Sequence, residues 1–148
     1  MARTKTEIIV THNRFPEIAA ALPEKTDIVV RKTAFDIEAR AKMRAAVDTG
    51  AMKNSIYVTL GTGESNYTDA VADALDKNPM AAILPEAAKP GEHEALIGPS
   101  VEYGPDVEYG TVKMAAQPFM TPAAEEVRDA FKKAMGQMLK EVTEREGR

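Results

Sequence analysis

Residues 103–123 of the chain read YGPDVEYGTVKMAAQPFMTPA. This stretch joins a short aromatic segment, a Gly-Thr turn, a run of small residues and a Pro-Phe-Met-Thr-Pro sequence. We predict a strand at Val107–Tyr109, followed by a helix that Thr121 caps and that has Pro122 in its first turn. The stretch holds no grouping of acid, base and nucleophile that would indicate catalysis. It is therefore interpreted as a structural joint, with Phe119 and Met120 packed in the core.

The sequence after this joint predicts a long C-terminal helix, because apolar residues recur there at helical spacing. They are Val127, Ala130, Phe131, Ala134, Met138 and Val142. The tail at about 143–148 is polar and is expected to fray. A second long helix is predicted from Pro23 to about Val47, since Pro favours a first helical turn. Its apolar face would hold Val30, Ala34, Ile37 and Ala41, and its other side Arg31, Lys32, Glu38 and Arg40.

Three further segments are predicted to be strands because they are rich in apolar and β-branched residues. They are Thr6–Thr11, Ser55–Leu60 and Ala95–Gly98. Ser55–Leu60 alternates in the manner of a half-buried strand. Asn13 is expected to cap a short helical turn that Pro23 interrupts. An irregular Pro/Gly-rich insertion covers about 61–93 and holds a short helix near Thr68–Leu75.

These elements predict one domain over residues 1–148 with an α+β fold. A small, mainly antiparallel sheet would pack against one long N-terminal helix and one long C-terminal helix. With 148 residues, of which 44% are hydrophobic, the chain is long and apolar enough for a single core.

Composition narrows the classes of function. The net charge of −4 disfavours a protein whose whole surface grips nucleic acid. The absence of cysteine excludes thiolate chemistry, disulfides and zinc–sulfur sites, and is compatible with a reducing cytosol. No apolar run reaches the roughly 20 residues that a membrane span needs.

Three blocks of sequence, in the same order as in a known family, carry a resemblance. They read VDTGAMKNSI at 47–56, YGPDVEYGT at 103–111 and AQPFMTPA at 116–123. This pattern resembles the neck and tail-completion proteins of long-tailed bacteriophages, which are often described as head–tail joining or tail-component proteins. Gly104 stands where that family usually has Ala, and the insertion at about 61–93 and the N-terminal segment depart from its pattern.

The resemblance implies a structural virion protein with no enzymatic activity, cofactor or metal. Such a subunit would form a homo-oligomeric ring of sixfold or twelvefold symmetry between the portal side and the tail tube. Other neck and tail proteins would be its partners, and packaged DNA would pass through without sequence-specific binding or any membrane contact. A tail-terminator or head-closure ring subunit, or a small nucleic-acid-binding module, are the alternatives. A small hydrolase lacks the residues it would need.

Subunit-interface candidates cluster at the joint and at the second residue block. They are Glu108, Tyr109, Thr111, Lys113, Met114, Gln117, Lys53 and Asn54. Glu108 would pair with a basic residue of a neighbouring subunit and fix the ring register. The alternatives are a solvated charge or an intrachain pair with Lys53. The segment Thr111–Gln117 would reach a neighbour, line the channel or form an ordinary surface loop.

Arg31, Arg40 and Lys42 on the first long helix are the candidates for a DNA-channel lining. The alternative for this basic cluster is a solvated face or an acidic partner. Metal and nucleotide sites are not indicated: Asp48 alone is too few carboxylates, and Gly61-Thr62-Gly63 lacks the Lys-Ser/Thr ending of a phosphate loop. His93 and His12 have no partners in the sequence pattern.

Overall fold

A computed structural model describes residues 13–146 and confirms the α+β class. Two long helices accompany a small antiparallel sheet. In chain order the elements are α1 (Phe15–Arg44), α2 (Ala51–Ser55), β1 (Ile56–Leu60), α3 (Tyr67–Lys77), β2 (Ala95–Pro99), α4 (Gly104–Tyr109) and α5 (Met120–Glu146). The strand predicted at Thr6–Thr11, and His12, lie outside the described residues.

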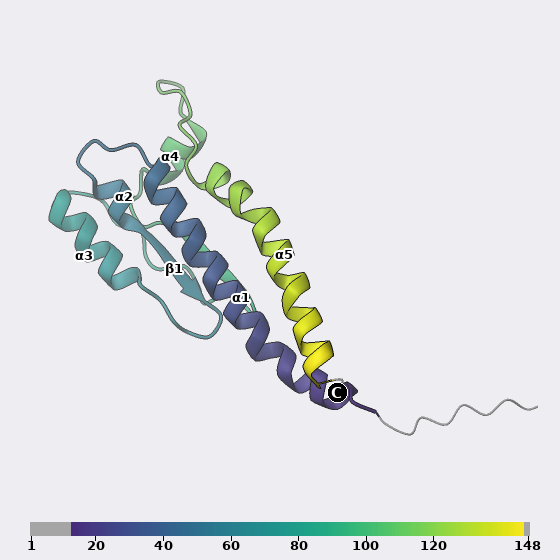
Figure 1. Ribbon diagram of the computed structural model, residues 1–148. Coiled ribbons are helices and arrows are strands. Elements are labelled where there is room, and N and C mark those ends of the chain that lie inside the picture. The colour runs from purple at the N-terminus through teal and green to yellow at the C-terminus, as the bar shows by residue number, and fades with distance from the viewer. Residues whose placement is uncertain (1–12, 147–148) are drawn as a thin grey trace, which may run out of the picture.

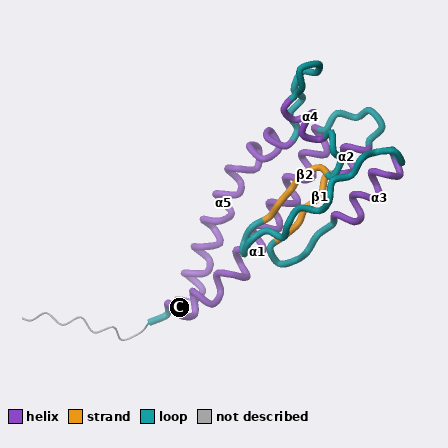
Figure 2. Tube along the Cα trace, turned by 180° about the vertical axis from the view of Figure 1, so that it is seen from behind, coloured by secondary structure: helices purple, strands orange, loops and turns teal. Residues whose placement is uncertain are grey.

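Helices α1 and α5 run side by side in opposite directions for most of their length (Figures 1 and 2). Their 30 and 27 residues correspond to about 45 and 40 Å of helix. Along the predicted stripe of α5, Val127, Met138 and Val142 are buried, whereas Ala130 is exposed. Helix α5 packs chiefly on α1, so within residues 13–146 much of its surface is not covered by another helix or strand.

The sheet has two strands, with β1 antiparallel to β2 and Val58 opposite Ile97. All five residues of β1 are buried, so the prediction of a half-buried strand was wrong. Helix α1 covers one face, where Ala34 packs with Val58. The second face is also covered, because the Tyr57 ring meets Tyr67 of α3 edge-on at 5.0 Å and its hydroxyl accepts a hydrogen bond from the Ala87 backbone.

Helix α1 begins at Phe15, not at Pro23, and contains Pro23 in its interior. The predicted interruption was therefore wrong, although the Asn13 side chain does accept a hydrogen bond from the Phe15 N–H at 3.1 Å. Pro lacks one N–H donor and disfavours an isolated helix. Packing against α5 over this stretch holds the helix continuous, since tertiary contacts supply most helical stability in proteins.

Val107–Tyr109, predicted to be a strand, lies in the short helix α4. Pro105 sits in its first turn and Gly110, with φ +75°, ends it. Pro at the start and Gly just past the end are helix signals that outweigh the aromatic and β-branched residues between them. The sheet of the described residues therefore consists of β1 and β2 alone.

The insertion at about 61–93 contains α3, as predicted, and is tied to the body of the molecule. Backbone hydrogen bonds join Leu84 N to Ser100 O at 2.7 Å and Glu102 N to Ala82 O at 2.9 Å. At the C-terminus, α5 continues to Glu146, past the residue near 143 where fraying was expected. Within residues 13–146, no helix is long and apolar enough to cross a membrane.

Candidate assembly surface

The Glu108 carboxylate caps the start of α5. It is buried, with 7% of its surface exposed. One carboxylate oxygen accepts from the backbone N–H groups of Phe119 (2.8 Å) and Met120 (2.9 Å). The other accepts from the N–H and the hydroxyl of Thr121 at 3.0 and 2.7 Å. Glu108 thus satisfies three N–H groups at the entrance of α5, and a carboxylate there also complements the positive end of the helix dipole.

Glu108 was predicted to lie in a strand and to pair with a basic residue of a neighbouring subunit, with a solvated charge or a pair with Lys53 as the alternatives. The strand was wrong, since Glu108 lies in α4, and its burial rules out a solvated charge. Its partners lie within the chain, and none of them is Lys53. Burial alone would raise the pKa of the Glu108 carboxyl, but the hydrogen bonds from Thr121, Met120 and Phe119 outweigh it and lower the pKa. Thr121 lies one residue inside α5, so the predicted capping role passes from its side chain to Glu108.

The three residue blocks that carry the family resemblance meet in one core cluster. Fully buried Phe119, as predicted, packs in this cluster with Met52 and Ile56 of the first block. Ala123 of the third block belongs to the same cluster, and Val107 of the second packs against it. These blocks therefore build the joint between α2, α4 and α5, and their residue types are explained by packing and capping.

A projecting loop, Thr111–Gln117, rises from this joint beyond the rest of the molecule (Figure 1). We call it the finger. Its tip is a tight turn in which Thr111 N donates to Met114 O at 2.8 Å and Met114 N donates back to Thr111 O at 3.3 Å. Gln117 N donates to Val107 O at 2.8 Å and fixes the base. A Cβ atom at Gly110 would lie 2.7 Å from Ala116 N. The close approach of the backbone at the two ends of the finger therefore requires glycine at position 110.

The remaining interface candidates fall into three groups. Tyr109, Thr111 and Lys113 are exposed on α4 and the finger. Met114 and Gln117 line a cavity of about 360 Å³ between the finger base and the turn before α2. Lys53 is exposed on α2 and Asn54 is half-buried there. Burial and a nearby Asp48 raise the pKa of Tyr103, which lines the same cavity.

The three proposed channel cations are each paired within the chain. Arg31 donates to both carboxylate oxygens of Glu64 at 2.8 and 2.9 Å, and this guanidinium lowers the pKa of Glu64. Arg40 pairs with Glu126 of α5 at 2.9 Å. Lys42 pairs at 2.7 Å with Glu38, which was expected on the solvated side of α1 but is buried.

Glu126 also pairs with Arg44, so one carboxylate of α5 is shared by two cations of α1. Together with Glu64 and Glu38, this carboxylate converts the predicted basic face into a set of local ion pairs. The acidic partners come from α5, from the turn after β1 and from α1 itself. Sequence spacing gave little sign of the first two, because they are 86 and 33 residues away from Arg40 and Arg31.

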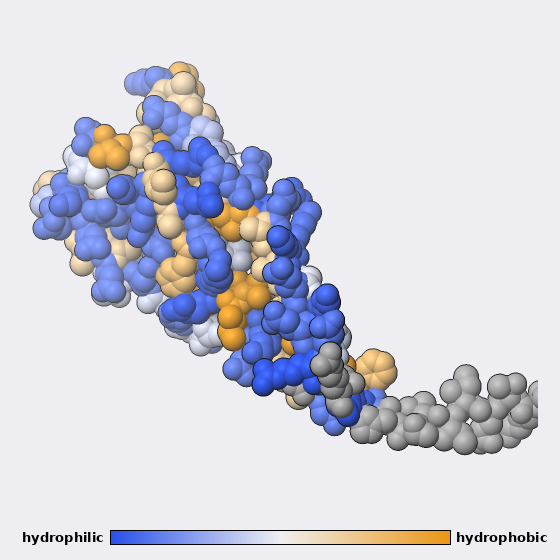
Figure 3. Space-filling model, viewed as in Figure 1, coloured by the Kyte–Doolittle hydropathy of each residue, from blue (hydrophilic) through white to orange (hydrophobic). Residues whose placement is uncertain are grey.

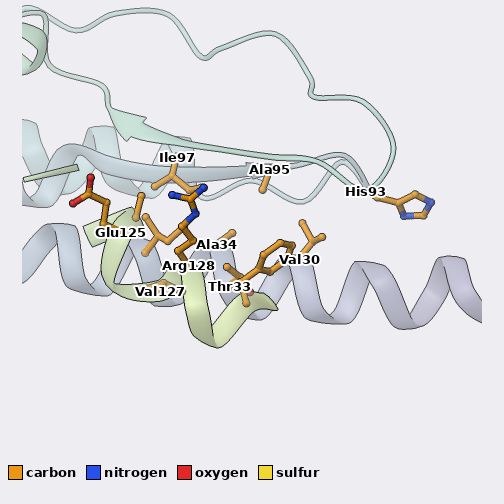
Figure 4. Close-up of a pocket in the computed structure, with 12 residues that line it drawn as sticks. Val30, Thr33, Ala34, His93, Ala95, Ile97, Glu125, Val127 and Arg128 are labelled. Carbon is orange, nitrogen blue, oxygen red and sulfur yellow. The ribbon is translucent and has the colours of Figure 1, made fainter. Parts of the chain in front are cut away.

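A groove that sequence reasoning missed lies between α1, β2 and α5 (Figure 4). Its volume is about 490 Å³. It is lined by Val30, Thr33, Ala34, Ile37, His93, Ala95, Ile97, Ala124, Glu125, Val127, Arg128 and Phe131. Figure 4 shows Arg128 reaching across toward Ile97, and His93 at the far end. On the face seen in Figure 3, further apolar side chains gather along the seam of α1 and α5.

His93 is paired with Asp27 of α1 at 2.8 Å, a contact that its position between two glutamates did not indicate. The described part of the chain contains no group of three or more His, Asp or Glu residues placed to hold a metal. The finger and the groove are the two surface features that the sequence-predicted sites do not explain. Comparison with known proteins found no matching family model, no similar curated protein and no similar solved structure.

Proposed function

We propose that this chain is a structural subunit of a ring in the neck of a long-tailed bacteriophage, completing the tail where it meets the head. The observation that carries the proposal is the meeting of all three resemblance blocks in one joint, which presents the finger. A subunit that assembles with other copies is expected to hold its projecting contact loop on a well-packed connection between helices. The protein acts by subunit contacts and requires no cofactor or catalytic group.

Two surface properties support a self-assembling subunit. Helix α5 packs chiefly on α1, which leaves an apolar groove on one side of the pair and a second apolar hollow on the other. A loop closed by backbone hydrogen bonds also projects away from the body of the molecule (Figure 1). Projections and hollows at different places on one chain favour head-to-tail contacts, which close into rings under cyclic symmetry. Sixfold or twelvefold rings suit the tail tube and portal that the resemblance implies.

The charges suit a channel through which DNA passes without being held. Arg31, Arg40 and Lys42 are neutralised by carboxylates of the same chain. Binding of nucleic acid is driven largely by release of counterions when free cations meet phosphates. A subunit whose basic residues are internally paired and whose net charge is −4 offers DNA little attraction. The alternative of a nucleic-acid-binding module is therefore less well supported.

The test is removal of the gene from the phage that encodes it, followed by electron microscopy of the lysate. We expect filled heads and separate tails to accumulate, and the chain supplied from a plasmid to restore joined particles. The purified chain should have a mass several times that of the 16.1 kDa monomer. Normal particles in the absence of the gene would contradict the proposal. The position of added density on restored particles separates tail completion from the tail-terminator and head-closure alternatives.

A further inference from the structure

The finger carries an apolar tip. Val112 is fully exposed, and it occupies a tight turn, where Gly, Asn, Asp and Ser are the usual residues. Lys113 beside it is exposed too. The turn is already closed by the hydrogen bonds between Thr111 and Met114. A preformed projection loses little conformational freedom on binding, which favours its use as a docking element.

The groove offers a matching recess. Its volume of about 490 Å³ is in the range of cavities that hold a small ligand, and apolar side chains form most of its wall. Two exposed charged residues of α5, Glu125 and Arg128, stand along it. Among the described residues, neither Glu125, Arg128 nor Lys113 has an ion-pair partner. The recess is thus apolar inside, and its rim carries one unpaired acid, Glu125, and one unpaired base, Arg128.

The finger cannot fill the groove of its own chain. It rises beyond the α4 end of the molecule, whereas the groove lies alongside the α1–α5 pair (Figures 1 and 4). Gln117 N and the close crossing at Gly110 hold the base of the finger in this direction. A finger that fills this groove therefore comes from another copy of the chain.

We propose that the finger of one subunit docks in the groove of the next, with Val112 in the apolar recess and Lys113 paired with Glu125. The contact uses two different surfaces, so it is head-to-tail, and it generates a ring when the rotation between neighbouring subunits closes. This inference rests on the ring proposed above and identifies the surfaces that close it.

Disulfide trapping tests the contact directly, because the chain has no cysteine of its own. A V112C chain is mixed with an A124C chain, whose new thiol lies in the groove, under mild oxidation. A disulfide requires Cα atoms within about 7 Å, so a covalent dimer that joins one V112C chain to one A124C chain reports docking, whereas dimers of a single variant do not. The matched control mixes V112C with A72C, on the exposed side of α3 and away from the groove. We expect at least a tenfold excess of dimer in the first mixture.

Substitution at the tip gives a second readout by mass measurement. V112D would bring a charge into an apolar recess, so we expect about 100-fold weaker assembly. The matched control M80D alters an equally exposed methionine outside the finger and should assemble normally. K113E and E125K should each weaken assembly about threefold, and the two together should restore it.

The outcomes separate this inference from the proposed function. Rings that form equally well with V112D and give no V112C–A124C disulfide would overturn finger docking and leave the ring intact. If removal of residues 2–12 abolishes such rings, the N-terminal segment is the occupant and the finger is not. A chain that stays monomeric at every concentration would contradict both the ring and the docking contact.

Discussion

A single buried carboxylate, Glu108, organises the joint at the scale of residues. It accepts four hydrogen bonds from the first residues of α5, and so fixes where that helix begins. Helix starts carry N–H groups that have no partner inside the helix, and a buried start without a cap is costly. Because Glu108 lies on α4, the same contacts fix α4 against α5 and hold both ends of the finger.

Replacement of this carboxylate should destabilise the fold. Glu108→Gln keeps the size of the side chain but turns an amide N–H₂ group toward N–H donors. We expect a loss of about 2 kcal/mol in the free energy of unfolding, within the range for capping residues and buried unsatisfied groups. Urea denaturation measures it. Glu102→Gln, at an exposed position, is the control and should change stability by less than about 0.5 kcal/mol. Equal effects of the two changes would refute the capping role.

The same carboxylate should make stability depend on pH. Its pKa in the folded protein is lower than its ordinary value of 4.5, so the unfolded chain binds the proton more readily. The stabilisation is therefore fully present above about pH 4.5 and is lost as the pH falls through the folded pKa. In the wild type, the urea concentration at the unfolding midpoint should stay high down to about pH 4.5 and decrease as the pH is lowered further. The fall should be shallower in Glu108→Gln, and parallel curves would contradict the assignment.

The importance of Glu108 could be suspected from sequence, but its partners could not. In the predicted strand at Val107–Tyr109, Glu108 would point to the opposite face from its two neighbours. An exposed acid was expected for that reason. Pro105 and Gly110 were the signal for a helix, and a helix would have turned Glu108 inward. No local rule links residue 108 to the N–H groups of 119–121, which come together only when the finger folds back.

At the scale of elements, the two long helices were predictable and their ends were not. The apolar stripe of α5 and the helical spacing of α1 identified both. The start of α1 was missed because Pro23 reads as a helix boundary, whereas α1 extends eight residues further toward the N-terminus, to Phe15. Helix α3 and strand β2 were found nearly at their observed bounds, since turn residues flank both.

Pro23 should reduce the stability of α1. In a helix interior Pro removes one hydrogen bond and crowds the preceding turn, at a cost of up to about 3 kcal/mol. Pro23→Ala should therefore raise the free energy of unfolding by about 1–3 kcal/mol, measured by thermal and urea denaturation. Pro16→Ala is the matched control, because Pro16 sits in the first turn, where Pro is favourable. A loss of stability in Pro23→Ala would show that the proline serves the fold.

At the scale of the whole molecule, the pairing of charges decides how the protein meets DNA. Carboxylates from α1, from the turn after β1 and from α5 each lie against a cation of α1. Each exposed pair contributes little to stability. Together they remove the basic surface that the α1 sequence suggested.

The chain should not bind double-stranded DNA at an ionic strength of about 0.15 M. The variant that combines Glu64→Gln with Glu126→Gln removes the carboxylates that pair with Arg31, Arg40 and Arg44. It should bind DNA at low salt and dissociate from it as the salt concentration increases. Fluorescence anisotropy with a short duplex measures both proteins. Salt-dependent binding by the wild-type chain would favour a nucleic-acid-binding module instead.

The sequence by itself determined the α+β class, the two long helices, helix α3 and strand β2, because hydrophobic periodicity and turn residues act over short distances. It also indicated the joint at 103–123 and the core role of Phe119. The tertiary structure decided the cap on α5, the neutralised face of α1, the second covered face of β1 and the groove. Each of these depends on groups far apart in the chain, and such pairings are set by packing of the whole fold and not by local pattern.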